Sequence, residues 1–291
     1  MIRKKIRCIA TDMDGTLLNS RMEISAFNRE AIQTARKNGI EVVAVTGRSY
    51  GEAAHLLAKS HISCPIISMN GAEIRNENND VIHAVQIDKK KAVEIATILR
   101  EVDLYKEMYT NDGIFTEDYK DGMEILVDIY HANKPHLEKS DIRHLTKKRL
   151  TDGLIHEIES YDDIFADNKQ QIYKFLAYAR HNDLLLDIQK KLKDIHGIVI
   201  TSSARNNIEV TNEFAQKGIA LEEFLTLKGI DLDETMGIGD NYNDLSMLEN
   251  VGRAVAMGNA HPDIKEACQF VTATNDEDGV GLAIQEVLQQ G

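Results

Sequence analysis

The feature that most constrains the fold is a repeated alternation of short apolar runs with amphipathic helical stretches near both ends of the chain. The apolar runs lie at 6–12, 41–47, 65–70, 235–240, 253–257 and 270–274. The helical stretches lie at 23–38, 50–60 and 243–250, after Pro262, and from 279 onward. Apolar strands separated by helices predict an α/β fold, with a parallel sheet covered by helices on both faces.

The middle of the chain has a different pattern. It holds longer helical stretches, such as 89–102 and 182–195, with strand-like pieces between them. We therefore predict a separate α+β domain at 84–205, inserted into a discontinuous core made of 1–83 and 206–291. The chain of 291 residues is long enough for this two-domain arrangement.

Composition excludes several kinds of partner and location. The formal net charge of −13 argues against nucleic acid as a partner, because a nucleic-acid binder needs a basic surface. No uncharged apolar run approaches the roughly 18 residues of a membrane span, and the first residues lack a cleavage signal. The three cysteines lie far apart and form no CxxC pair, as in a reducing compartment. We expect a cytoplasmic protein without a membrane partner.

Three of the apolar runs end in polar residues suited to bind a metal ion or a phosphate. These endings are Asp12-Met13-Asp14, Thr46-Gly47-Arg48 and Gly239-Asp240-Asn241. In an open parallel sheet, ligands bind beyond the carboxyl ends of the strands. The three segments are therefore expected to meet at one edge of the sheet and to form a single site.

Asp12 and Asp14 pose a charge problem, because two carboxylates this close raise the cost of ionising each other. A divalent metal ion relieves that repulsion, and Mg²⁺ prefers oxygen ligands with few protein groups among them. Asp12, the backbone carbonyl of Asp14 and Asp240 are the predicted ligands, with water and phosphate completing the shell. The ion would also polarise the phosphoryl oxygens.

Phosphoryl transfer is the chemistry that fits these residues. Asp12 is the predicted nucleophile, which forms an aspartyl-phosphate intermediate. Asp14 is the predicted general acid for the leaving alkoxide, and then the general base for the water that resolves the intermediate. Thr46 can donate its hydroxyl to a phosphoryl oxygen, with the Gly47 backbone N–H beside it.

Two later segments supply further candidates. Lys217 precedes Gly218 and an amphipathic helix, and its ammonium suits a phosphate oxygen. In "GDNYND", at 239–244, Asn243 can face the phosphate if a helix opens there. Asp244 is then expected to orient Lys217 or a metal-bound water. For Arg48, support of the helix and contact with the substrate are equally plausible roles. We therefore do not include Arg48 in the predicted site.

The chain resembles the haloacid-dehalogenase (HAD) superfamily phosphatases, and among them the Cof-type hydrolases with a type IIB cap. Four motifs carry the resemblance in order: "DMDGT" at 12–16, "VTGR" at 45–48, Lys217-Gly218 and "GDNYND" at 239–244. Three flanking segments are also similar: "MNGA" at 69–72, "VAMGNA" at 255–260 and "NDEDGV" at 275–280. Gln216 is a small departure, because a small or acidic residue commonly precedes the lysine.

The resemblance implies a Rossmannoid core that uses Mg²⁺ to hydrolyse small phosphate monoesters, such as sugar phosphates or phosphorylated cofactors. By the same resemblance, the Met13 backbone, Thr46, Gly47, Lys217 and Asn243 would hold the phosphate. The insertion between Arg48 and Lys217 would be the cap. We expect it to close over the catalytic edge, exclude water and choose the substrate.

Three functional classes stay open at this point. The first is a phosphatase acting on a small phosphorylated metabolite. The second is a phosphomutase similar to the capped phosphomannomutases, which would return the phosphoryl group to the sugar. The third is a non-catalytic phosphate-sensing protein, against which Asp14 argues because a lasting phospho-aspartate is better served without an acid/base group. The substrate, the cap residues that select it and the oligomeric state are not determined by the sequence.

Overall fold

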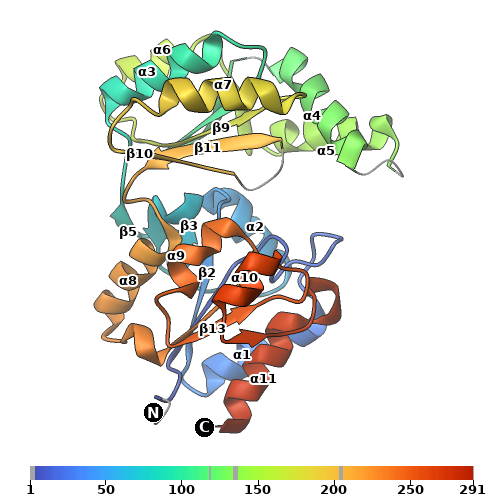
Figure 1. Ribbon diagram of the computed structural model, residues 1–291, viewed down its shortest axis with the longest axis vertical. Coiled ribbons are helices and arrows are strands. Elements are labelled where there is room, and N and C mark those ends of the chain that lie inside the picture. The colour runs from blue at the N-terminus through green and yellow to red at the C-terminus, as the bar shows by residue number, and fades with distance from the viewer. Residues whose placement is uncertain (1–3, 118, 134–136, 203–205, 291) are drawn as a thin grey trace. The chain divides into compact units, whose positions relative to one another are not determined.

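The computed structural model describes residues 4–117, 119–133, 137–202 and 206–290. The chain divides into two compact units (Figure 1), one made of Met1–Ala84 with Phe214–Gly291 and one made of Val85–Glu213. We call these the core unit and the inserted unit. The predicted α/β class with an inserted α+β domain is confirmed. Within the described ranges, no helix combines the length and the apolar character that crossing a membrane requires.

The core unit is built on one eight-stranded sheet with the order β14-β13-β12-β1-β2-β3-β4-β5. Its strands are β1 (Cys8–Thr11), β2 (Glu41–Val45), β3 (Ile66–Ser68), β4 (Glu73–Arg75), β5 (Val81–Ala84), β12 (Thr235–Gly239), β13 (Arg253–Ala256) and β14 (Phe270–Val271). The strands from β14 to β3 are parallel, whereas β4 and β5 pair antiparallel at one edge. This hairpin was not predicted from the sequence, because its strands of three and four residues leave little periodicity.

Helices cover both faces of this sheet. They are α1 (Ala26–Lys37), α2 (Tyr50–Lys59), α8 (Lys217–Lys228), α9 (Leu245–Leu248), α10 (Pro262–Ala267) and α11 (Gly279–Gln290). The chain moves outward from β1 to β2 and β3 in one direction, and from β12 to β13 and β14 in the other. Because such crossovers are right-handed, the two sets of connecting helices lie on opposite faces. Helices α1 and α11 lie side by side (Figure 1).

The register of the central strands fixes where the polar strand endings lie. Thr11, the last residue of β1, pairs with Ile238 on β12 and with Ala44 on β2. All three strands are parallel, so their carboxyl ends reach the same edge of the sheet. Asp12, Thr46 and Asp240 follow these strands directly and therefore start from one edge.

The inserted unit has its own six-stranded sheet, with the order β10-β11-β9-β6-β7-β8. Its strands are β6 (Tyr105–Thr110), β7 (Gly113–Thr116), β8 (Ile155–Glu157), β9 (Ile172–Tyr178), β10 (Ile198–Thr201) and β11 (Asn207–Asn212). Its helices are α3 (Lys89–Arg100), α4 (Tyr119–Asn133), α5 (Lys139–Thr151), α6 (Tyr161–Ala166) and α7 (Asn182–Leu192). Apolar residues of α3, α6 and α7 pack against the sheet in a hydrophobic core separate from that of the core unit.

The predicted domain boundary at 205/206 is wrong by several residues. Residues 203–205 lie outside the described residues, but β11 belongs to the inserted unit, which extends to Glu213. The physical reason is pairing: β11 forms antiparallel ladders with β9 on one side and β10 on the other. A strand in the middle of a ladder cannot belong to the other unit.

Helix α8 supports the site by burying one face in the core. Phe224 is fully buried, whereas Leu227, one turn further on, is 58% exposed. We expect Phe224→Ala to lower the free energy of unfolding by about 3–5 kcal/mol, since it leaves a cavity in a packed core. The matched control Leu227→Ala should change it by less than about 0.5 kcal/mol. Urea denaturation measures both, and equal losses would contradict the packing described here.

Candidate active site

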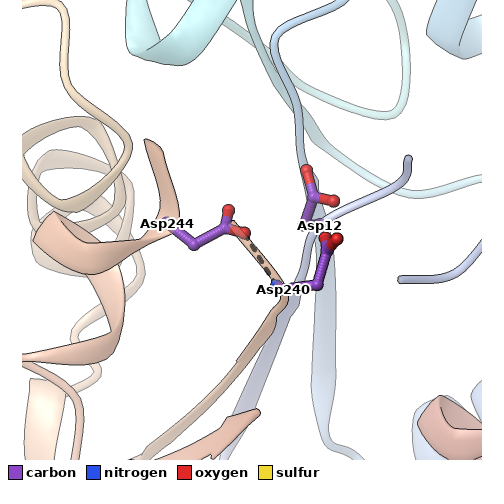
Figure 2. A group of neighbouring side chains, drawn as sticks. All are labelled: Asp12, Asp240 and Asp244. Carbon is purple, nitrogen blue, oxygen red and sulfur yellow. Dashed lines mark hydrogen bonds between the residues drawn. The ribbon is translucent and has the colours of Figure 1, made fainter. Parts of the chain in front are cut away.

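Three carboxylates meet at the edge where the central strands end. Asp12 follows β1, Asp240 follows β12, and Asp244 lies four residues further on, at the end of the short 3₁₀ helix η3 (Tyr242–Asp244). Each offers a carboxylate oxygen, and these oxygens lie within 4.8 Å of one another. Figure 2 shows the three side chains reaching a common region from different segments. Residues far apart in the sequence thus form one acidic cluster.

Lys217, the first residue of α8, contacts two of these carboxylates. Its side chain is fully buried, and its Nζ donates to Asp12 Oδ1 at 2.6 Å and to Asp244 Oδ1 at 2.6 Å. The next residue, Gly218, permits this approach, because a Cβ there would overlap the carbonyl oxygen of Ser246. A glycine directly after the lysine therefore lets α8 begin close to the loop that carries Asp244.

Asp244 also fixes the backbone that leads away from β12. Its Oδ2 accepts hydrogen bonds from the backbone N–H groups of Asp240 and Asn241, both at 3.0 Å, and Figure 2 draws the first of these. The hydroxyl of Thr16 donates to Asp240 Oδ1 at 2.9 Å. One carboxylate therefore holds both the lysine and the turn, while a threonine from the first motif holds Asp240.

The cluster carries more negative than positive charge. Burial raises the pKa of Asp12 well above its ordinary value, and the neighbouring Lys217 opposes this rise. Burial alone would lower the pKa of Lys217, but the contacts with Asp12 and Asp244 outweigh burial and raise it. Burial and the charge of Asp244 raise the pKa of Asp240 to about 6, against the hydrogen bond from Thr16. Ionising all three carboxylates beside one ammonium is costly without a further cation.

The donor set fits a hard divalent cation. Carboxylate oxygens are the ligands that Mg²⁺ prefers, and a buried group with excess negative charge gains from such an ion. Asp12, Asp240 and Asp244 can each contribute an oxygen, although Asp244 already uses both of its oxygens for hydrogen bonds. Asp12 and Asp240 are therefore better placed than Asp244 to bind a metal ion directly.

Asp14, the predicted acid/base group, is not one of the three clustered carboxylates, but its charge contributes to the raised pKa of both Asp12 and Asp240. Its two oxygens accept hydrogen bonds from Arg48, from Nε at 2.7 Å and from Nη2 at 2.7 Å. The Asp14 side chain is 48% exposed, and that of Arg48 is 23% exposed. The pair joins the loop after β1 to the loop after β2. Arg48 was not among the predicted site residues, although it follows Gly47 in "VTGR".

The predicted phosphate-binding residues line the same edge. Met13 is fully buried, and its carbonyl accepts from the backbone N–H groups of Thr16 and Leu18.

Thr46 is fully buried directly after β2, and its hydroxyl oxygen accepts from the backbone N–H of Arg48 at 3.1 Å. Asn243, in η3, donates from Nδ2 to Asn70 Oδ1 at 3.2 Å.

Three residues of this region were missed as site residues by sequence reasoning. Thr16 holds Asp240, Arg48 holds Asp14, and Asn70 accepts from Asn243. Each stands inside or beside a motif that the sequence analysis quoted, respectively "DMDGT", "VTGR" and "MNGA". The motifs were therefore a usable signal, but the partner of each residue is far away in the sequence.

Comparison with known proteins identifies the family of this chain. A family model described as haloacid dehalogenase-like hydrolase matches residues 9–284. Phosphatase YwpJ of Bacillus subtilis (strain 168) is 33% identical over 285 residues, which cover 97% of this chain and 100% of the relative. The 5-amino-6-(5-phospho-D-ribitylamino)uracil phosphatase YwtE of the same organism is 34% identical over 284 residues, covering 97% and 98%. A solved haloacid dehalogenase-like hydrolase from B. subtilis has a TM-score of 0.86 at 33% identity, covering 96% of this chain and 99% of that one.

The fold and the relatives define a hydrolase of the α/β class that acts on phosphate monoesters and is related to the haloacid dehalogenases. The chain belongs to the haloacid dehalogenase-like hydrolase family, as its sequence motifs predicted. Its relatives are named phosphatases, so the reaction class follows from the family.

The raised pKa of Asp240 predicts a pH-dependent effect in metal-free protein. A carboxyl with a folded pKa of about 6, above its ordinary 3.8, costs stability when ionised. That cost is full above about pH 6 and disappears as the pH falls toward about 4. Asp240→Asn, which keeps an acceptor for Thr16, should therefore raise the free energy of unfolding at pH 7.5 by about 1–3 kcal/mol.

Urea denaturation in EDTA at pH 7.5 and at pH 5 measures this effect. The advantage of the variant should be smaller at pH 5, and the exposed control Asp187→Asn should show none at either pH. A variant that is less stable than the wild type at pH 7.5 would contradict the charge balance described above.

Proposed function

We propose that this protein is a Mg²⁺-dependent phosphatase that hydrolyses small phosphate monoesters through an aspartyl-phosphate intermediate on Asp12. The observation that carries the proposal is the buried Lys217 ammonium, 2.6 Å from Asp12 and 2.6 Å from Asp244. It stands beside the nucleophile, where the phosphoryl oxygens of a substrate would lie. Positive charge placed there in advance stabilises the charge that develops in phosphoryl transfer.

In the first half of the reaction, an Asp12 carboxylate oxygen attacks the phosphorus of the ester in line with the leaving oxygen. The phosphorus–oxygen bond to the leaving alcohol breaks, and Asp14 donates a proton to that oxygen. Asp14 accepts two hydrogen bonds from Arg48, so at least one of them must open when the carboxyl faces the leaving group.

In the second half, water attacks the phosphorus of the aspartyl phosphate. Asp14, now a carboxylate, takes the proton from that water, and the bond between Asp12 and the phosphorus breaks. Inorganic phosphate leaves, and the Asp12 carboxylate is restored. Lys217 keeps its contact with Asp244 through both halves, so its charge stays beside the transferred group.

The phosphate would be held by groups at the ends of β1, β2 and β12. The Met13 backbone, the Thr46 hydroxyl, the Gly47 backbone N–H, Lys217 and the Asn243 amide are the proposed contacts. Asp12, the backbone carbonyl of Asp14 and Asp240 would hold Mg²⁺, which when bound polarises the phosphoryl oxygens and offsets the carboxylate charge. We assign Asp244 the task of orienting Lys217, since both groups are fully buried and in contact.

We further propose a phosphorylated sugar, sugar alcohol or cofactor as the substrate. The relative YwtE, which is 34% identical, is named for 5-amino-6-(5-phospho-D-ribitylamino)uracil, a pyrimidine that carries a phosphorylated sugar alcohol. Such phosphorylated intermediates occur in the cytoplasm, and the three cysteines of this chain are free, as in a reducing compartment.

A phosphate-release screen tests the proposed function. We expect release in the presence of Mg²⁺ from members of a panel of p-nitrophenyl phosphate, hexose phosphates, ribitol 5-phosphate, flavin mononucleotide and 5-amino-6-(5-phospho-D-ribitylamino)uracil. EDTA should abolish it, and Asp12→Asn should lower kcat by about 10³-fold or more, because the nucleophile is lost.

The exposed variant Asp187→Asn is the control for the screen and should keep wild-type activity. Activity that survives EDTA or Asp12→Asn would rule out this mechanism. Isomerisation of a hexose phosphate that needs a sugar bisphosphate primer, in place of phosphate release, would identify a mutase.

A separate prediction concerns Asp14. In Asp14→Asn, p-nitrophenyl phosphate should still phosphorylate Asp12, because its leaving group needs no general acid, but hydrolysis of the intermediate should be slow. The phosphorylated protein should therefore accumulate, with the added mass of one phosphoryl group in mass spectrometry. An alkyl phosphate should give no such accumulation. Equal losses for both substrates, without phosphoprotein, would contradict the two-step role of Asp14.

A further inference from the structure

The turn that follows β3 has an unusual backbone. Three consecutive residues, which form the 3₁₀ helix η1 (Met69–Gly71), have positive φ: Met69 at 50°, Asn70 at 59° and Gly71 at 103°. Left-handed backbone is costly for Met, and asparagine tolerates it better than most residues. All three residues are buried. Backbone strain of this kind persists only where contacts with the surrounding structure hold the turn in place.

The turn is fixed to the loop after β2 through its backbone. The N–H of Asn70 donates to the carbonyl of Thr46 at 2.9 Å, and the N–H of Met69 donates to the carbonyl of Arg48 at 2.8 Å. These bonds connect the left-handed residues to both sides of Gly47. The conformation of "MNG" and that of "TGR" are therefore set together.

The Asn70 side chain then reaches a second segment. Its Oδ1 accepts from Asn243 Nδ2 at 3.2 Å, so it touches the loop after β12. The same Oδ1 lies 3.0 Å from where a Cβ on Gly47 would be, so it also borders the loop after β2. Asn70 itself is 5% exposed. One buried amide thus lies between two of the segments to which we assign phosphate binding.

A third segment packs against the turn at Gly71. A Cβ at this position would lie 2.6 Å from the carbonyl oxygen of Gln216, the residue before Lys217. The absence of a side chain at Gly71 therefore lets the turn lie against the start of α8. The turn contacts the segments of Thr46, Asn243 and Lys217, all from within the core unit.

We infer that Asn70 is a positioning residue for phosphate binding, which acts by orienting the Asn243 amide and the Thr46-Gly47 backbone. The inference rests on the proposed function and adds to it a residue that need not touch the substrate. The contrasting view is that Asn70 serves only the left-handed turn. The two views differ in what glycine does at this position, because glycine adopts the left-handed backbone more easily but has no amide.

Asn70→Gly separates the two roles. The turn is kept, so the melting temperature should stay close to that of the wild type. With p-nitrophenyl phosphate and Mg²⁺, kcat/KM should fall by about 10–100-fold, the range found when groups that orient ligands are removed from a site. Inhibition by inorganic phosphate should weaken in parallel, because the ground-state contacts of the phosphate are disturbed as well.

Asn79→Gly is the matched control. Asn79 also has positive φ, 70°, but it is exposed in the turn between β4 and β5, where its side chain accepts from Arg75. This variant should leave kcat/KM and phosphate inhibition unchanged. A loss of activity in Asn79→Gly as large as that in Asn70→Gly would overturn the inference.

The double variant Asn70→Gly/Asn243→Ala tests the route through Asn243. Because Asn70 acts partly by orienting Asn243, the double variant should lose less activity than the product of the losses in the two single variants. Losses that multiply, or wild-type kcat/KM in Asn70→Gly, would overturn the inference.

Binding of orthovanadate with Mg²⁺, measured as a rise in melting temperature, distinguishes this inference from the proposed function. If the wild type hydrolyses nothing in the panel but is stabilised by orthovanadate, and Asn70→Gly is not, the positioning role stands and hydrolysis fails. Equal stabilisation of the wild type and Asn70→Gly would overturn the positioning role, whatever the activity.

Discussion

The site depends on one buried cation between two buried anions. Lys217 has no exposed side-chain surface, and it contacts Asp12 on one side and Asp244 on the other. Charges this deeply buried are tolerated only when they are paired and hydrogen-bonded, and removing one partner from such a group is far more costly than never burying it. The start of α8 and the ends of β1 and β12 are therefore tied to one another electrostatically, and the chain cannot move one of them without breaking an ion pair.

This arrangement keeps a charge imbalance that a structure optimised for stability alone would avoid. Three carboxylates face one ammonium, and burial together with the charge of Asp244 raises the pKa of Asp240 to about 6. The imbalance makes the region receptive to a divalent cation and, through it, to a phosphate dianion. The surrounding hydrogen bonds, from Thr16 to Asp240 and from the backbone to Asp244, hold the carboxylates in place before any ligand arrives. Preorganisation of this kind is the main means by which a protein stabilises phosphoryl transfer.

The sheet and the segments that form the site could be predicted from the sequence, because both follow from short-range patterns. Each central strand is an apolar run with a polar ending, and parallel strands carry their endings to one edge, so Asp12, Thr46 and Asp240 were predicted to start together. The contacts between these segments could not be predicted in this way, because the two partners of each contact are far apart in the sequence. Arg48 pairs with Asp14 at a separation of 34 residues, and Asn243 meets Asn70 across 173. The end of the insertion was misplaced for the same reason, because the place of β11 is decided by its ladders with β9 and β10.

The interrupted core has a consequence for how the protein is made. Strand β1 pairs with β12 from the far end of the chain, and Lys217, which contacts Asp12, lies 205 positions after it. On the ribosome, the first strands emerge with one side of β1 lacking its neighbour, and the inserted unit, which has its own sheet and apolar core, is synthesised before that neighbour. A nascent chain therefore carries an open sheet edge for most of its synthesis, which exposes it to pairing with other chains. The catalytic site can form only after the last third of the polypeptide, which carries Lys217, Asp240 and Asp244, has left the exit tunnel.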